Sequence, residues 1–248
     1  MNESLDILQE AAQGVQKEVA ALPKATSTPK SEADARQEQT VEQRILSEAA
    51  ISPKAALISL AAELERVAQE VLATTGHLRG RRFVPVLQAV EEVHSTYGLA
   101  AHVPNSLRHF WDVRNRLIHR NEGTNEDILR AIDSGLAILR ALQTLPREVS
   151  IVHDPNVAIY SDSDLKLPVQ GVHGVMLETT SPGGASKSYR IFPTTRNHFL
   201  KGRQVSWEWN MTNVFARAWY RDPATGRGRE AWGSSMEFVG RHLDELTS

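Results

Sequence analysis

Apolar residues between positions 52 and 146 recur every three or four residues, which is the spacing of helices that pack along one side. Ser52 and Pro53 are typical of an N-cap and a first helical position, and Gly76 follows the last apolar step of that helix. Three more helices are predicted, over about residues 82–97, from Pro104 to about residue 120, and from Thr124 or Asn125 to Pro146. Four helices joined by short loops predict an antiparallel four-helix bundle at residues 51–146.

After Pro146 the pattern changes to short stretches of alternating apolar and β-branched residues, which are typical of strands. The predicted strands are Val157–Tyr160, Val172–Thr180, Tyr189–Phe192, Val205–Trp209, Val214–Tyr220 and Glu230–Trp232. Ala216–Tyr220 and Glu230–Trp232 should close as a hairpin over the turn at 222–226. Ser234 with Glu237 resembles a capping box before a final helix through Leu246. We therefore expect a small, mostly antiparallel β module at residues 147–248.

The segment before the bundle has a different character. Residues 4–22 carry apolar side chains at heptad spacing, residues 23–34 have no hydrophobic period, and residues 35–50 are rich in helix-forming Gln and Glu. We expect a helical arm and linker at residues 1–50, whose first helix either forms a short dimerising coil or docks on the main body. The fold class is then α+β, with an N-terminal helical arm, a helical bundle and a β module.

The formal net charge of −2 hides an uneven distribution of charge along the chain. Residues 1–50 carry nine acidic and five basic side chains, whereas residues 186–229 carry nine basic and two acidic ones. An acidic arm therefore precedes a basic β module, and basic surfaces that also present aromatic rings are a common way of holding single-stranded RNA.

Composition excludes several classes of function. The chain has no cysteine, which excludes disulfide frameworks, thiolate nucleophiles and cysteine-ligated zinc. Its histidines do not pair with carboxylates at the spacing of metal ligands, and it has no dinucleotide or P-loop motif, so we expect neither metal nor cofactor. No apolar run approaches the ~20 residues of a membrane span, and the first residues do not resemble a signal peptide. A cytoplasmic protein without a membrane partner is expected.

The third predicted helix contains a cation where its apolar stripe requires a hydrophobic residue. The stripe runs through Leu107, Phe110 and Trp111 and resumes at Leu117 and Ile118, and Arg114 occupies the missing step. A guanidinium facing a core is costly unless it is paired or lines a cleft. Glu65 interrupts an apolar stripe of the first bundle helix, which starts at Pro53, and we expect it to pair with Arg114.

Next to this arginine, two further residues could carry chemistry. Asn115 and His119 are four residues apart and so share one helix face, with Arg114 flanking it. Metal-independent RNA cleavage needs a base for the 2′-hydroxyl, a cation for the phosphate and an acid for the leaving 5′-oxygen. Because a single His119 cannot easily perform both proton transfers, the chemistry favours a two-fold homodimer through the helical bundle.

The run Arg114-Asn115-Arg116-Leu117-Ile118-His119 resembles the R-X4–6-H signature of HEPN domains, which lies late in the third helix of a four-helix bundle. The run from Ser52 to Ala56, followed by Glu65, also resembles the first helix of uncharacterised bacterial HEPN-like proteins. The resemblance implies a homodimeric, metal-independent endoribonuclease that leaves 2′,3′-cyclic phosphate ends, with Arg114, Asn115 and His119 as catalytic residues. Such nucleases occur in toxins, phage defence and RNA processing, so an antitoxin or defence partner is also implied.

Further residues are candidates for binding RNA. On the third helix these are the additional basic side chains Arg108, His109, Arg116 and Arg120, as phosphate contacts. In the β module, Trp207 and Trp209 are two residues apart, share one face of a strand and lie among basic residues, so they could stack on bases. The alternative is that these tryptophans form the core of the module while the arginines face solvent.

A non-enzymatic function is also consistent with the sequence. Many HEPN-like bundles act as non-catalytic RNA-binding or protein-interaction modules. In such a module, Arg114 would be a structural ion-pair partner and His119 a cation favoured by the C-terminal end of its helix. The two hypotheses differ in whether incubation with RNA yields cyclic-phosphate products.

Overall fold

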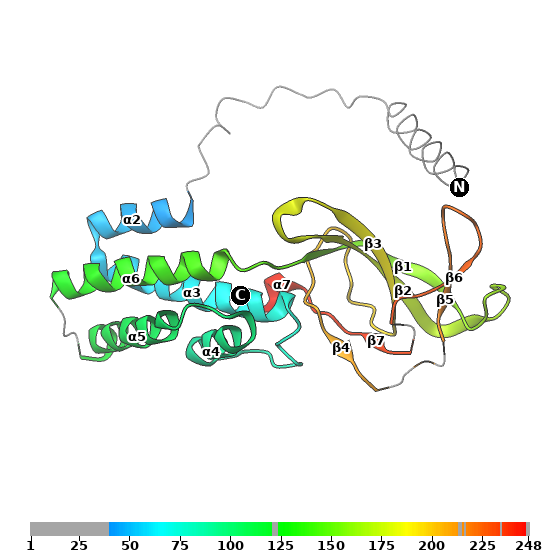
Figure 1. Cartoon of the computed structure of the whole chain (residues 1–248), viewed down its shortest axis with the longest axis horizontal. Helices are drawn as coiled ribbons and strands as arrows, with labels where there is room; N and C mark the ends of the chain where they lie inside the picture. The colour runs from blue at the N-terminus through cyan, green and yellow to red at the C-terminus, as the bar shows by residue number, and fades with distance from the viewer. Residues whose placement is uncertain (1–39, 121–123, 213–214, 216, 234, 247–248) are drawn as a thin grey trace, which may run out of the picture. The chain divides into compact units, whose positions relative to one another are not determined.

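The computed structural model describes residues 40–120, 124–212, 215, 217–233 and 235–246. Within them the chain is mixed α+β, as expected: a group of helices is followed by a curled antiparallel sheet (Figure 1). The chain from Val41 onward forms one compact unit. The arm helix expected at residues 4–22 and the linker expected at 23–34 lie outside the described residues.

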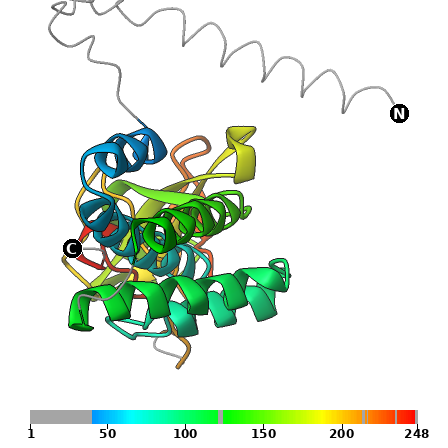
Figure 2. The same ribbon diagram turned by 90° about the vertical axis from the view of Figure 1, so that its left-hand side faces the viewer.

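Helix α3 is the central element of the helical part. The helices are α2 (Val41–Ile51), α3 (Pro53–Thr74), α4 (Val86–Tyr97), α5 (His102–Arg120) and α6 (Asn125–Gln143). α3 contacts each of the other four, and Figure 2 views these helices from their own side, with the sheet behind them. The core between them contains the fully buried Leu57, Leu60, Leu64, Phe110 and Ile128. This burial of one face of each helix is what the three-and-four spacing predicts.

The predicted helix starts at Ser52 and Thr124 are confirmed. The Ser52 hydroxyl oxygen accepts a hydrogen bond from the Ala55 amide at 3.4 Å, and Pro53 is the first helical residue. Thr124 forms a capping box with Asp127 at the start of α6. Each cap satisfies an amide that has no partner inside its helix.

Two helix boundaries differ from the prediction. α4 begins at Val86 rather than near residue 82, because Pro85 occupies the N-cap position and Gln69 holds the preceding loop. The Gln69 side chain donates to the Arg82 carbonyl at 2.9 Å and accepts from the Val84 amide at 3.3 Å. α2 falls within the segment that the sequence predicts as the arm, but Ile45 and Ala49 are buried in the helical core and Glu42 pairs with Arg140 of α6 at 2.7 Å. The helical part therefore begins at Val41.

The strands form an antiparallel sheet whose two edges meet. Within the described residues its order is β3-β2-β1-β5-β6. The strands are β1 (Val149–Tyr160), β2 (Pro168–Thr180), β3 (Lys187–Thr194), β5 (Trp219–Arg221) and β6 (Gly228–Glu230). Trp219 pairs with Glu230, which confirms the predicted hairpin. The Trp232 amide, just after β6, donates to the Ile191 carbonyl of β3 at 2.9 Å, so the sheet curls back on itself.

The last segment of the chain does not form the predicted long helix. Glu237–Phe238 is instead a strand, β7, paired with β4 (Trp209–Asn210), and only Leu243–Leu246 is helical (α7). Ser234, the expected cap, lies outside the described residues. The Glu237 carboxylate accepts hydrogen bonds from the Thr195 amide, at 3.1 Å, and from the Thr195 hydroxyl. A partner 42 residues away in the sequence has therefore taken the side chain that the capping pattern needed.

The helical part and the sheet part are joined by backbone and side-chain hydrogen bonds. The Trp207 amide donates to the Ala73 carbonyl at the end of α3, at 2.8 Å. In the loop that follows α3, the Gly80 amide donates to Glu208 at 2.9 Å and the Arg81 carbonyl accepts from Arg241 at 2.9 Å. These contacts hold the loop between α3 and α4 against the β module.

Candidate functional site

Helix α5 separates a buried apolar face from an exposed polar one. Leu107, Phe110, Val113 and Leu117 are buried. The stripe predicted from the sequence included Ile118, but Ile118 is 42% exposed, and Val113 supplies the step that Arg114 was expected to interrupt. From Phe110, a step of three reaches Val113 and a step of four reaches Arg114, and either step can continue a helical stripe. In α5 the orientation of the helix buries Val113.

The exposed face carries a hollow of about 500 Å³ lined by polar side chains of α5. The lining residues are His109, Asp112, Asn115, Arg116, His119 and Arg120. Asn115 and His119 share this face, as their spacing predicted, and three of the four additional bases join them. Arg108 does not line the hollow, because its guanidinium pairs with Glu91 of α4 and donates to Asn105 at 2.9 Å.

Arg114 is half-buried, and it is not one of the described residues that line this hollow. Its guanidinium lies over the Trp111 ring, 5.5 Å from the ring centroid, and its Nη1 donates to Asn115 Oδ1 at 3.0 Å. The prediction that Arg114 pairs with Glu65 is wrong, because within the described residues the Glu65 carboxylate makes no ion pair with Arg114. The Arg114 Nε atom is buried and has no hydrogen-bond partner. An aromatic ring has taken the place of the expected carboxylate.

This placement limits what Arg114 can do. It reaches the hollow only through Asn115, whose Oδ1 accepts from it, so the Asn115 NH2 group is left to donate to a ligand. Among the described residues that line the hollow, Arg116 and Arg120 carry guanidinium groups, and Asp112 carries the one carboxylate. The hollow is therefore suited to a phosphate group held by guanidinium and amide donors.

The two histidines of the hollow are well separated within one protomer. His109 and His119 are ten residues apart on α5, which corresponds to about 15 Å along the helix axis at 1.5 Å per residue. They cannot act together on one phosphodiester in a single protomer. A shared site would need a second copy of α5.

The predicted RNA-stacking tryptophans of the β module are part of its core. Trp207 and Trp209 pack against the fully buried Phe192 and Phe238, and both indole rings lie 5.5 Å from the Phe192 ring, centroid to centroid. This geometry agrees with the alternative that the two tryptophans pack into the core of the module, and it does not support their assignment as RNA-stacking residues. Strand alternation predicts a shared face but not whether that face is buried. The exposed tryptophan is Trp232, which is 45% exposed and lies beneath the Arg190 guanidinium.

No group of three or more metal-ligating side chains occurs among the residues that the structure describes. In that same part of the chain, no helix has the length and apolar composition that crossing a membrane requires. Comparisons of the chain with family models, with curated proteins and with solved structures give no match.

Proposed function

We propose that the protein is a metal-independent endoribonuclease of the HEPN type that binds RNA on the exposed face of α5. The observation that carries this proposal is that two imidazoles, two guanidiniums and one amide able to donate line a single hollow. Asn115 and His119 of the predicted motif are both among these lining residues. Imidazoles exchange protons near neutral pH, and guanidiniums stabilise charge on a phosphate. The resemblance of residues 114–119 to the HEPN signature supports the same chemistry.

The roles differ in one respect from those that the resemblance implies. His119 is the proton-transfer group, and Arg116 with Arg120 stabilises the charge that develops on the phosphate. Arg114 is a positioning residue: by donating to Asn115 Oδ1 it directs the amide NH2 toward the hollow. Products with 2′,3′-cyclic phosphate ends follow from attack by the 2′-hydroxyl.

A homodimer would supply the second proton-transfer group. Four of the six residues that line the hollow are placed symmetrically about position 114: His109 and His119 are each five residues from it, and Asp112 and Arg116 are each two. Antiparallel packing of two α5 helices about a two-fold axis there sets His109 against the partner's His119 and Asp112 against the partner's Arg116. The interface is then complementary in charge, and each phosphate lies between two imidazoles.

The decisive experiment incubates purified protein with total RNA in EDTA and maps the ends of the products. Wild type should cleave, and His119→Ala or Arg116→Ala should lower the rate by ~100-fold or more, the usual contribution of an acid–base group or a charge-stabilising donor. His102→Ala is the matched control, because His102 is an exposed histidine of the same helix that does not line the hollow. Full activity in His119→Ala would overturn the assignment.

A second candidate function is a non-catalytic RNA-binding or protein-interaction module. It is favoured by Arg114, which stacks on Trp111 and donates to Asn115 as a structural side chain does. His119 and Arg120 are in the last turn of α5, where the helix dipole stabilises cations whatever their function. This module would bind RNA with a steep dependence on salt and release no cyclic-phosphate product.

The biological setting of either function rests on the HEPN resemblance alone. By that resemblance we propose a cytoplasmic toxin or phage-defence effector that acts with an antitoxin or another defence protein. Expression in bacteria tests this: wild type should arrest growth, and His119→Ala should not. Arrest by both proteins would separate any toxicity from RNA cleavage.

A further inference from the structure

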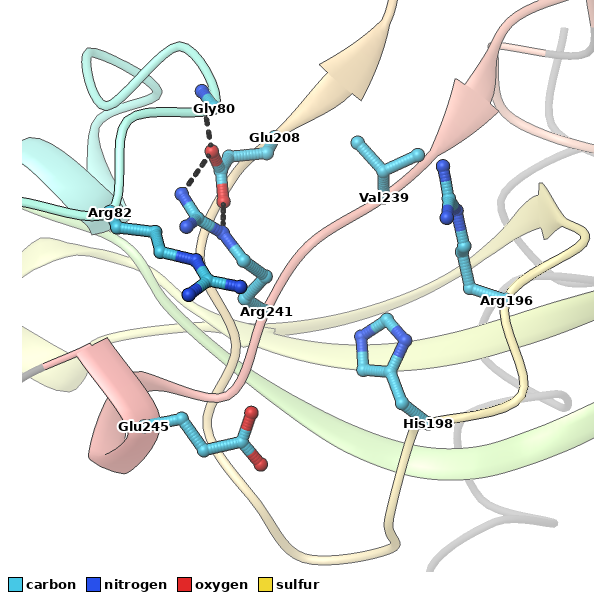
Figure 3. A pocket seen from close by; sticks show the side chains of 8 residues that line it. All are labelled: Gly80, Arg82, Arg196, His198, Glu208, Val239, Arg241 and Glu245. Carbon is cyan, nitrogen blue, oxygen red and sulfur yellow. Dashed lines mark hydrogen bonds and ion pairs between the residues drawn. The ribbon is translucent and has the colours of Figure 1, made fainter.

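A second polar pocket lies where the loop between α3 and α4 meets the β module (Figure 3). It has a volume of about 430 Å³, within the size range of small-molecule sites. Its lining residues come from the α3–α4 loop, from the segment between β3 and β4, from the segment between β7 and α7, and from α7 itself. Arg82 and Arg241 lie on one side of it in Figure 3, and Arg196 and His198 on the other.

One wall of this pocket is a fixed ion pair. Glu208 Oε1 accepts from Arg241 Nη2 at 2.7 Å and from the Gly80 amide at 2.9 Å, and its Oε2 accepts from Arg241 Nε at 2.8 Å and from the Ser206 hydroxyl at 2.7 Å. The carboxylate is only 5% exposed, and these donors saturate it. Its charge is therefore neutralised inside the protein, and it does not oppose an anion in the pocket.

The other two guanidiniums have donors to spare. In the described part of the chain, the Arg82 side chain has no ion pair or hydrogen bond; only its backbone carbonyl is engaged, by Gln69. Arg196 is 3.7 Å from Glu237, and its side chain is 56% exposed. That carboxylate already accepts two hydrogen bonds from Thr195, so Arg196 remains free to turn toward a ligand.

We propose that this pocket binds the phosphate group of a small phosphorylated ligand. Guanidinium groups present paired donors that match the oxygens of a phosphate, and two of them without a strong partner face one cavity. Among the described lining residues, Glu245 is the other acidic one, and its Oε1 pairs with Arg203 Nη1 at 3.7 Å. A ligand between Arg82 of the helical part and Arg196 of the β module would tie the two together. This site is separate from the α5 hollow and does not depend on the proposed nuclease function.

The test is calorimetric titration of the full chain with inorganic phosphate, pyrophosphate and ADP at fixed ionic strength. Wild type should bind at least one of these probes saturably, at one per chain, with a rise in melting temperature. Arg82→Ala and Arg196→Ala should each weaken binding by tenfold or more without changing the melting temperature of the ligand-free protein. Arg227→Ala is the matched control, because Arg227 is exposed and does not line this pocket.

The probes also separate the sources of the phosphate. Equal affinity for pyrophosphate and ADP assigns the site to the phosphate groups alone, and tighter binding of ADP assigns it to a nucleotide; either result supports the proposal. It is overturned if none of the three probes binds. It is also overturned if Arg227→Ala weakens binding as much as Arg82→Ala, because the effect is then one of general charge.

Discussion

Replacing Glu208 by alanine should destabilise the protein strongly. The carboxylate accepts four hydrogen bonds, and the substitution leaves Arg241, Ser206 and Gly80 without their acceptor. The Arg241 side chain is 25% exposed, so most of a cation would remain buried without a counter-ion. Breaking a buried ion pair from one side costs about 3–5 kcal/mol. Because Arg241 keeps its bond to the Arg81 carbonyl and some contact with water, we expect about 3 kcal/mol.

Urea unfolding followed by tryptophan fluorescence measures this cost, since Trp207 and Trp209 flank Glu208 in the sequence. The double variant Glu208→Leu with Arg241→Met removes both charges together, and it should recover most of the lost stability. A loss below about 1 kcal/mol in Glu208→Ala would refute the reasoning, because it would place the pair in the range of surface ion pairs. The reasoning would also be refuted if the double variant lost as much unfolding free energy as Glu208→Leu and Arg241→Met lose together as single variants.

Three further outcomes follow from the packing and the charges. Phe192→Ala should cost about 3–5 kcal/mol in the same urea assay and alter tryptophan emission, because Phe192 is fully buried among indole rings. Gly135→Val should lower the melting temperature, since even a Cβ at Gly135 would lie 2.6 Å from Leu60 Cδ2; a rise through better helix propensity would contradict the close packing. Burial would raise the pKa of Glu208 and Glu237, but hydrogen bonds, from Arg241 and from Thr195 respectively, outweigh it and hold both pKa values below their ordinary value. Both groups therefore contribute stability that is complete above the pKa of an unfolded glutamate, about 4.3, and is lost as the pH falls through their folded pKa values. Unfolding free energies measured from pH 7 to pH 3 should fall below about pH 4, and less steeply in Glu208→Gln.

The helices could be predicted because their signals are local. The hydroxyls of Ser52 and Thr124 cap amides three residues away, and the apolar period reports a buried face whatever packs against it. The errors arose where a distant residue decided the outcome. Glu237 looked like part of a helix start, but Thr195 holds its carboxylate. The spacing of Trp207 and Trp209 predicted their shared face, but the core position of Phe192 decided that this face packs inward.

The candidate site was predictable in its polar half only. Asn115 and His119 could be placed together because four residues make about one helical turn, and the additional bases at 109, 116 and 120 follow the same rule. The side on which Arg114 lies could not be predicted, because both Val113 and Arg114 continue the stripe from Phe110 within the tolerance of a helix. The bundle core selects the residue with no charge to desolvate, and Val113 is the one that is buried.

Arg114 is also the residue on which the two candidate functions make opposite demands. A catalytic cation must touch the phosphate, whereas a structural one needs only an aromatic ring and an acceptor, and Arg114 has both of these. If RNA is cleaved, the charge on the phosphate must then be met by Arg116 and Arg120, and Arg114 acts through the orientation of Asn115. The nuclease proposal therefore requires Arg116 to matter more for the rate than Arg114, whereas the non-catalytic module requires only that both contribute to the stability or charge of α5. That ordering follows from the orientation of α5, which buries Val113 and leaves Arg114 at the edge of the core.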